Sequence, residues 1–175
     1  MSVIARLYQL KASDPFGVLS YGPLRLPCAL GPSGVRPRKR EGDGATPQGL
    51  WPLRRVLYRA DRMRRPRTDL PIAATKPTDG WCDASGDRNY NRQVVLPYGG
   101  SAESLCRSDD VYDLVVIMGF NDAPRVRGHG SAIFLHIARP GFTPTAGCIA
   151  LRRGDLLRLL EFPVPPRWID TRSRP

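Results

Sequence analysis

Hydrophobic residues along this chain occur mostly in short runs that are separated by proline, glycine and charged residues. Short apolar runs with such boundaries are typical of strands and turns rather than of a helical bundle. The run at residues 113–119 is apolar enough to lie at the centre of a sheet. We therefore predict a mainly β fold, a sandwich or barrel with one or two short helices. The predicted strands are residues 3–10, one or two within 17–30, 53–58, 94–97, 113–119, 131–138 and, as a last edge strand, 167–171.

One helix is predicted close to the end of the chain. Its apolar stripe at helical spacing consists of leucines, namely Leu156, Leu157, Leu159 and Leu160. Asp155 is the predicted N-cap, and Phe162-Pro163 ends the helix. Residues 31–49 are predicted to be a polar loop. Because no repeat or long linker divides the sequence, residues 1–175 are predicted to form one domain, with its chemical motifs at residues 44–160.

The charge balance narrows the choice of partner without fixing it. The chain has 27 lysines and arginines against 16 aspartates and glutamates, a net charge of +11 that comes almost wholly from arginine. Such an excess suits a polyanion, which can be nucleic acid, an anionic membrane surface or a carboxylate-rich cell-wall polymer. One basic segment is either a solvated face or a surface for such carboxylates, and it contains Arg54, Arg55, Arg59, Arg62, Arg64, Arg65 and Arg67.

The positions of cysteine and histidine argue against a metal site. The four cysteines, at positions 28, 82, 106 and 148, include no Cys-x-x-Cys pair, and the chain has two histidines. Zinc sites draw their ligands from closely spaced pairs, so we predict no metal and no cofactor. A disulfide among Cys28, Cys82 and Cys106 requires an exported protein, and the sequence leaves it open.

Two features concern the location of the protein. No uncharged apolar run approaches the roughly 18 residues that a transmembrane helix needs, so no membrane span is predicted. Residues 1–11 lack the basic start and the long apolar core of a signal peptide. The sequence therefore shows no export signal, and a cytoplasmic location stays open.

The segment 134–151 combines residue types that suit nucleophilic catalysis. His136 lies in an apolar run, a loop with two prolines and a glycine follows, and Gly147-Cys148 leads back into apolar sequence. If residues 132–138 form a strand, the return of the chain can bring the imidazole of His136 beside Cys148 to take the thiol proton. Gly147 lacks a Cβ, which allows unusual φ and close approach of a substrate carbonyl. The amides at Gly147 and Cys148 can then donate to an oxyanion.

The same residues have simpler interpretations. A cysteine among small apolar residues is often a buried core residue, and so is a histidine in an apolar strand. His129 is a rival base because its glycine neighbours give it mobility, but it precedes the predicted strand and fits the spacing less well. Residue types alone therefore leave catalysis open.

Two motifs in the chain resemble those of the YkuD-type L,D-transpeptidases, the cysteine enzymes that cross-link bacterial peptidoglycan. In that family a histidine on a strand is followed by a loop and then by Ser/Thr-x-Gly-Cys and an apolar residue. His136 and the stretch Thr-Ala-Gly-Cys-Ile at 145–149 match this pattern. Upstream, Thr-Pro-Gln-Gly-Leu-Trp at 46–51 resembles the Thr-Pro-x-Gly-x-aromatic turn that precedes the catalytic half. Residues 79–83, 89–91 and 109–113 are similar to a short proteobacterial branch without a signal peptide.

The resemblance implies a β-sandwich-like domain with Cys148 as nucleophile, His136 as base and Gly147 beside the oxyanion. Cys148 would attack the carbonyl of the third residue of a peptidoglycan stem peptide and release the terminal D-amino acid. An acceptor amine would then give a 3→3 cross-link, whereas water would make the protein an L,D-carboxypeptidase. The implied partners are donor and acceptor stem peptides, in the periplasm or cell envelope. Substrate contacts are expected from Thr145, Arg152, Tyr112, Asn91 and His129.

Two positions depart from the family pattern and keep other functions open. The family often has histidine where this chain has Ala146 and arginine where it has Ala150, with Arg152 or Arg153 as candidate replacements. Because these positions help to hold substrate, a catalytically silent wall-binding module on the same fold stays an alternative. A basic nucleic-acid-binding protein is a further alternative. However, the chain shows no helix-turn-helix, zinc-finger or RRM pattern, and no aromatic residues are interleaved with its basic cluster. We therefore expect no nucleic-acid partner.

Overall fold

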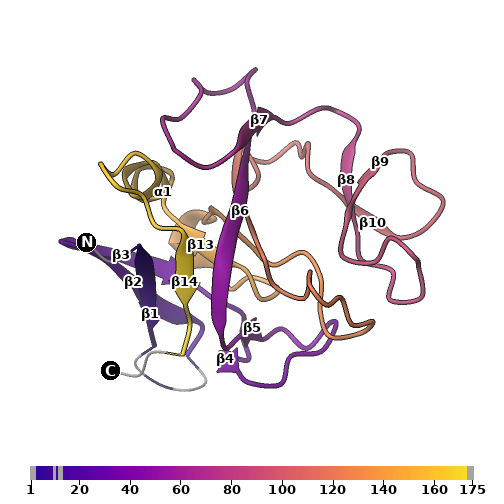
Figure 1. Ribbon diagram of the computed structural model, residues 1–175, viewed down its shortest axis with the longest axis horizontal. Helices are drawn as coiled ribbons and strands as arrows, with labels where there is room; N and C mark the ends of the chain where they lie inside the picture. The colour runs from indigo at the N-terminus through magenta and orange to yellow at the C-terminus, as the bar shows by residue number, and fades with distance from the viewer. Residues whose placement is uncertain (1–2, 10, 12–13, 173–175) are drawn as a thin grey trace.

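The computed structural model describes residues 3–9, 11 and 14–172 and is built mainly from β-strands (Figure 1). One α-helix and one short 3-10 turn complete this part of the chain. The elements in chain order are β1 (Ile4–Tyr8), β2 (Phe16–Tyr21), β3 (Leu24–Ala29), β4 (Val35–Arg36), β5 (Thr46–Pro47), β6 (Leu50–Tyr58), β7 (Ile72–Ala74), β8 (Asp79–Cys82), β9 (Gln93–Val95), β10 (Ala102–Ser104), β11 (Leu114–Met118), β12 (Phe134–Ile137), η1 (Pro140–Phe142), β13 (Ile149–Leu151), α1 (Arg153–Leu160) and β14 (Trp168–Asp170).

The main sheet closes into a barrel of eight strands. Its order is β11-β12-β13-β3-β2-β1-β14-β6, and the pairing of β6 with β11 closes the ring. The strand β7 pairs with the second half of β6 outside this ring. Closure leaves no free edge among the eight strands, and of the two architectures expected from the sequence the barrel is the one observed.

The barrel interior holds the larger of two hydrophobic clusters. Every one of the eight strands contributes to it, because alternate side chains of a strand point to opposite faces of a sheet. Thus Leu114, Val116 and Met118 of β11 point inward, and so do Leu135 and Ile137 of β12. The helix α1 adds three buried leucines to the same cluster, Leu156, Leu159 and Leu160.

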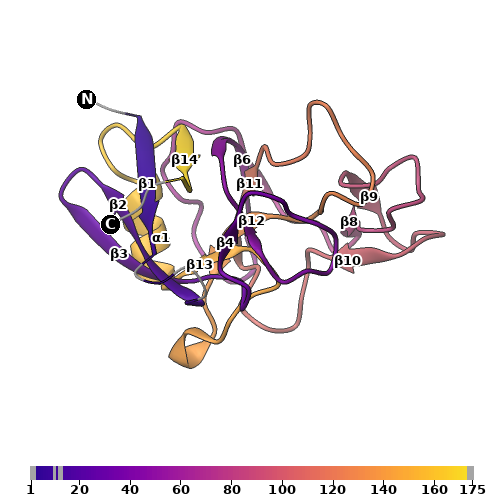
Figure 2. The ribbon, with the colours of Figure 1, turned by 90° about the horizontal axis from the view of Figure 1, so that it is seen from below.

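The smaller cluster lies on the outer face of the barrel. Val115 and Ile117 of β11 and Phe134 of β12 point outward there and are covered by the segment 79–112. This segment contains the small antiparallel sheet β10-β8-β9, which lies on the side of the barrel away from β1–β3 in both ribbon views (Figures 1 and 2). The outer face of β11 and β12 is therefore a buried surface, not a solvated one.

The structure corrects two of the expectations for the end of the chain. Asp155 is not the N-cap, because α1 begins at Arg153 with Arg152 as its cap residue. Asp155 lies in the first turn instead, where a negative charge is favourable near the helix N-terminus. The strand near residues 167–171 is not an edge strand, since β14 lies between β1, in parallel pairing, and β6. Closing the barrel requires this insertion, which local sequence does not reveal.

Other boundaries also differ from the expected ones. The loop at 31–49 contains the two-stranded parallel pair β4–β5, and the strands β7, β8 and β10 were not expected from the sequence. The strand that carries His136 begins at Phe134, because Ala132 has a φ of 53° that interrupts extended backbone. Leu10, the last residue of the first expected strand, lies outside the described residues.

Candidate active site

His136 and Cys148 lie on neighbouring parallel strands and face the same side. His136 is on β12, and Cys148 comes directly before β13. The register pairs Leu135 with Ile149 and His136 with Ala150, which brings Cys148 level with Phe134. Because side chains alternate along both strands, Phe134, His136 and Cys148 all point to the outer face of the barrel. The connection between the two strands runs through the short turn η1.

The thiol of Cys148 is fixed by two backbone groups. Its Sγ lies 3.2 Å from the carbonyl oxygen of Ala132, to which the thiol donates, and it accepts the N–H of Phe134 at 3.3 Å. Only 5% of Cys148 is exposed. The residue therefore sits in a defined position at the wall of the barrel, with the unusual backbone of Ala132 turning its carbonyl toward the sulfur.

The imidazole of His136 is oriented by a backbone carbonyl and an aromatic ring. Nδ1 lies 2.9 Å from the carbonyl oxygen of Ile137, so Nδ1 carries the proton and Nε2 has the free lone pair. The ring of Tyr112 stands edge-on to the imidazole with the centroids 5.4 Å apart. Among the described residues, no carboxylate is hydrogen-bonded to the His136 ring.

Burial keeps both groups neutral in the unliganded protein. It raises the pKa of the Cys148 thiol to about 12, against a smaller lowering by the Phe134 N–H. It lowers the pKa of His136 to about 4, and the nearby Arg139 and Arg107 add to this effect. Both shifts favour the uncharged forms of the two groups, the thiol of Cys148 and the neutral imidazole of His136.

The turn before Cys148 is held by Thr145. Its Oγ1 donates to the carbonyl oxygen of Cys148 at 2.7 Å and accepts the N–H of Gly147 at 3.1 Å. The backbone N–H of Thr145 in turn donates to Leu30 at 2.9 Å. The hydroxyl that was expected to contact substrate thus bonds within the turn that presents Cys148.

The two family-like motifs meet at Gly147. Gly147 has a φ of 127°, and a Cβ added there would lie 2.5 Å from the carbonyl oxygen of Ala45. The segment with Ala45 is held by the next residue, because the Thr46 hydroxyl accepts the N–H of Gly31 at 3.1 Å. The upstream motif therefore forms the support on which the turn with Cys148 rests, about a hundred residues away in sequence.

Replacement of Gly147 by alanine is expected to lower the free energy of unfolding by about 3 kcal/mol. Alanine would be strained at this φ, and its Cβ would clash with the backbone carbonyl of Ala45, which is not free to move away. The matched control is Gly141→Ala, whose φ of 73° is also positive but whose Cβ would meet nothing within 4 Å. It is expected to cost about 1 kcal/mol. Chemical denaturation measures both, and equal losses would show that the contact with Ala45 is unimportant.

A cavity of about 550 Å³ joins His136 and Cys148 to a set of charged side chains. Tyr112 and Thr145, both expected at the site, also line it. The other lining residues are Lys39, Glu41, Gly42, Asp83, Glu103, Arg107, Val111, Ser131, Ala132, Arg139 and Ala146. The described residues hold no group of three or more histidine, cysteine, aspartate or glutamate side chains placed to bind a metal ion.

The charged lining is itself organised by hydrogen bonds. Tyr112 donates to Glu103 at 2.9 Å, and the guanidinium of Arg107 lies over the ring of Tyr112 at 5.4 Å. Burial raises the pKa of the Glu103 carboxyl. The buried Oδ1 of Asp83 has no hydrogen-bond partner. The cavity therefore presents both cationic and acidic groups to a ligand, as suits a peptide that carries carboxylates and amines.

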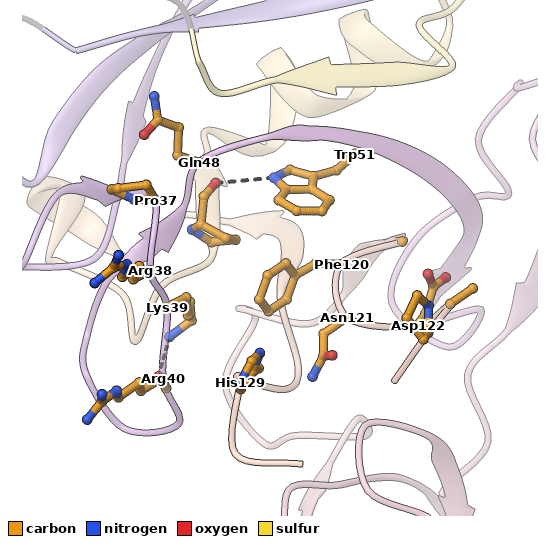
Figure 3. Close-up of a pocket in the computed structure, with 14 residues that line it drawn as sticks. Pro37, Arg38, Lys39, Arg40, Gln48, Trp51, Phe120, Asn121, Asp122 and His129 are labelled. Carbon is orange, nitrogen blue, oxygen red and sulfur yellow. Dashed lines mark hydrogen bonds between the residues drawn. The ribbon is translucent and has the colours of Figure 1, made fainter. Parts of the chain in front are cut away.

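The structure does not bring His129, Asn91 or Arg152 to this cavity. His129 is exposed and lines a separate cavity of about 560 Å³ near Trp51 and Phe120 (Figure 3). The two cavities adjoin at Lys39, which lines both.

Asn91 and the basic residues after Cys148 serve other contacts. The side chain of Asn91 is buried and bonds to Trp81, to the carbonyls of residues 120 and 121 and to the N–H of Ala132, so it supports the scaffold behind the site. Arg152 stacks over Phe142 at 5.2 Å beside a different hollow. Arg153 pairs with the buried Asp113 at 2.7 Å.

Several residues of the cavity were not expected from the sequence. Arg139 directly follows the strand of His136, and its place at the start of the loop is a local signal that sequence reasoning can use. Glu103 and Arg107 belong to the covering segment, and Lys39 comes from the loop before β5, so only the fold brings them to Cys148. All four cysteines are free thiols in this structure.

The closed barrel thus presents a cysteine and a histidine at one cavity of its outer face. The family model of the YkuD L,D-transpeptidase catalytic domain matches residues 20–167, which is most of the chain. The chain therefore belongs to the YkuD L,D-transpeptidase family. No curated protein and no solved structure matches it.

Membership places the protein in an acyltransferase family whose substrates are peptidoglycan peptides and which is typically associated with the cell envelope. Within the described residues, no helix has the length and apolar character needed to cross a membrane.

Proposed function

We propose that this protein is a cysteine-dependent L,D-transpeptidase that forms 3→3 cross-links between peptidoglycan stem peptides. The observation that carries the proposal is the joint presence of Cys148 and His136 on one face of adjacent strands, in one cavity, with Nδ1 of His136 held by a carbonyl. Family membership supplies the reaction class.

In the first step His136 acts as the general base. Its Nε2 takes the thiol proton as Sγ of Cys148 attacks the carbonyl carbon of the third stem residue. The imidazolium that forms keeps its Nδ1–H on the carbonyl of Ile137, which stabilises the positive charge. Because both groups start neutral, the step moves a proton within the cavity and needs no ion pair beforehand.

The negative charge that develops on the substrate oxygen needs a donor close to Sγ. The N–H of Gly147 already bonds to Thr145, so the N–H of Cys148 is the candidate donor in the turn. Collapse of the tetrahedral intermediate breaks the peptide bond. The imidazolium of His136 then protonates the leaving amine of the D-amino acid, and a thioester on Cys148 remains.

In the second half of the reaction an acceptor amine attacks the thioester. His136 takes a proton from this amine, the C–S bond breaks, and Cys148 recovers its proton from the imidazolium. Water in place of the amine would release a tripeptide, which is the L,D-carboxypeptidase outcome. Arg107 and Arg139 line the cavity, where both pair with Asp109. They are our candidates for contacting stem carboxylates, in the role expected for the family arginine that Ala150 replaces.

The experiment that tests this function is product analysis with a purified disaccharide-tetrapeptide as sole donor and acceptor. A cross-linked dimer together with free D-alanine is expected. Tripeptide and D-alanine without dimer would make the protein a carboxypeptidase. Binding of the muropeptide without any turnover by folded protein would leave only a wall-binding role on this fold.

Alkylation of Cys148 by iodoacetamide in the unliganded protein is expected to be slow at pH 7. It should rise by about tenfold per pH unit up to pH 9, since only the thiolate reacts and a pKa of about 12 keeps its fraction proportional to hydroxide. Peptide-level mass spectrometry follows Cys148 apart from the other three thiols. A rate that is already constant between pH 6 and 8 would contradict the neutral pair and indicate a preformed thiolate.

A further inference from the structure

A separate cavity on the outside of the barrel is lined by four arginines. It measures about 370 Å³ and lies against β6, β9 and β11, and its arginines are Arg54, Arg55, Arg92 and Arg125. Asp122 is the one carboxylate among the described residues that line it. Four positive charges against one negative leave a net charge of +3 around this small, open cavity. None of these residues lines the cavity of Cys148.

A β-bulge places two consecutive arginines at this cavity. Arg55 pairs with Ile117 and Leu53 pairs with Met118, so Arg54 is an extra residue without a partner across the strand. In a regular strand, neighbours point to opposite faces, and one of these side chains would point into the barrel. The bulge turns both outward, which is how bulges commonly re-aim a side chain.

The arginines differ in how well they are already paired. Arg54 forms an ion pair with Asp122 at 2.9 Å, and Arg55 donates to the side-chain oxygen of Gln93 at 2.5 Å. Arg92 and Arg125 form no ion pair or side-chain hydrogen bond with any residue that the structure describes. The Nε of Arg125 is buried without an acceptor, and burial and the charge of Arg92 lower the pKa of Arg125. The cavity thus brings together two cations that repel each other. The one nearby carboxylate, Asp122, offsets part of the charge of Arg125 but is hydrogen-bonded to Arg54.

Both unpaired arginines are carried by rigid backbone. Arg92 follows Asn91, whose buried amide donates to the carbonyls of Phe120 and Asn121. Asn121 in turn accepts the N–H of Val126 at 2.8 Å and donates to two carbonyls of the same loop, at residues 126 and 130. The two asparagines therefore link the segments that present Arg92 and Arg125. The backbone at both arginines is therefore in a defined place, while the side chain of Arg92 is exposed and is ordered only when a ligand binds.

We propose that this arginine-lined cavity is a binding site for a phosphoryl group. The buried Nε of Arg125 is a donor that an acceptor in the cavity can satisfy, and planar guanidinium groups bind phosphate and carboxylate oxygens in pairs. A carboxylate would neutralise only one of the two unpaired cations, whereas a phosphoryl dianion neutralises both. The group can belong to free phosphate or to a phosphorylated sugar, and the cavity recognises the chemistry that the two share.

The test is isothermal titration of the whole protein with inorganic phosphate and with N-acetylglucosamine phosphate. Ionic strength is kept constant with sodium chloride, because diffuse attraction to a basic protein is screened by salt and a specific site is less so. Saturable binding is expected, with affinity reduced by at least about tenfold in Arg92→Gln and Arg125→Gln, since each removes charged hydrogen bonds. These two side chains bond to nothing in the described scaffold, so both variants are expected to fold.

The matched control is the double variant Arg64→Gln with Arg65→Gln, two exposed arginines outside the cavity. It removes more charge than either single variant and is expected to keep the affinity. Tighter binding of the sugar phosphate than of phosphate, with no binding of unphosphorylated N-acetylglucosamine, would identify an ester as the ligand. Equal losses in the control and the cavity variants, or no saturable binding, would overturn the proposal. Binding does not involve Cys148, so the result is independent of the transpeptidase activity.

Discussion

Replacement of Cys148 by alanine is expected to abolish the covalent adduct that forms when the protein meets a tetrapeptide muropeptide. In the wild type, intact-mass spectrometry should show the protein with the tripeptide portion attached and D-alanine released. Without Sγ no thioester can form, so turnover should fall by at least about a thousandfold. The adduct is the direct readout because it reports the nucleophile rather than the overall rate.

Cys148→Ser is the control that separates the nucleophile from the scaffold. Alanine removes two polar contacts, to the carbonyl of Ala132 and the N–H of Phe134, and is expected to cost about 2 kcal/mol of stability. Serine can keep both contacts but is a far weaker nucleophile. The specificity control is Cys106→Ala, because Cys106 is a half-buried thiol outside the cavity. This variant should form the adduct normally. An adduct on Cys148→Ala protein would sink the proposed mechanism.

His136→Gln is expected to slow formation of the acyl-enzyme by about a hundredfold to ten-thousandfold at pH 7, the range for loss of a positioned general base. Glutamine can still meet the carbonyl of Ile137 through its amide, but it has no lone pair that can accept the thiol proton. Single-turnover kinetics by intact mass give this rate directly. The deficit should shrink as pH rises, because hydroxide then forms the thiolate without a base.

The pH dependence distinguishes a base from a merely structural histidine. If His136 only shapes the cavity, the deficit of the glutamine variant would be the same at pH 7 and pH 9. The rival base is tested in parallel by His129→Gln, which is expected to keep its rate within about twofold because His129 lines another cavity. A larger loss in His129→Gln than in His136→Gln would reverse the assignment of the base.

The chemistry-bearing part of the chain could be predicted because its signals are local. A strand around His136, a turn-rich loop and a glycine before Cys148 follow one another within a short stretch. Parallel strands that are neighbours in sequence usually become neighbours in the sheet, so the pair meets without help from distant residues. The family assignment from these motifs is confirmed by the family match. The catalytic roles of the two residues stay a prediction.

The residues expected to contact substrate were harder to predict, because their positions depend on packing between segments far apart in the sequence. Asn91 directly follows Tyr90 in a polar stretch of the sequence, yet its amide is used up by buried backbone groups. His129 lies between two glycines, yet it lines a different cavity from Cys148. In contrast, Glu103 and Arg107 carry no local signal and still line the cavity.

The sequence by itself determined the β class, the family, the strand with His136 and the place of the turn with Cys148, because periodicity and turn chemistry act over a few residues. Only the tertiary structure decided that the sheet closes into a barrel, with β14 between β1 and β6. It also decided that the covering segment buries Cys148 and His136 and so keeps both neutral. Burial and the resulting pKa values depend on residues far apart in the chain, and no local pattern records them.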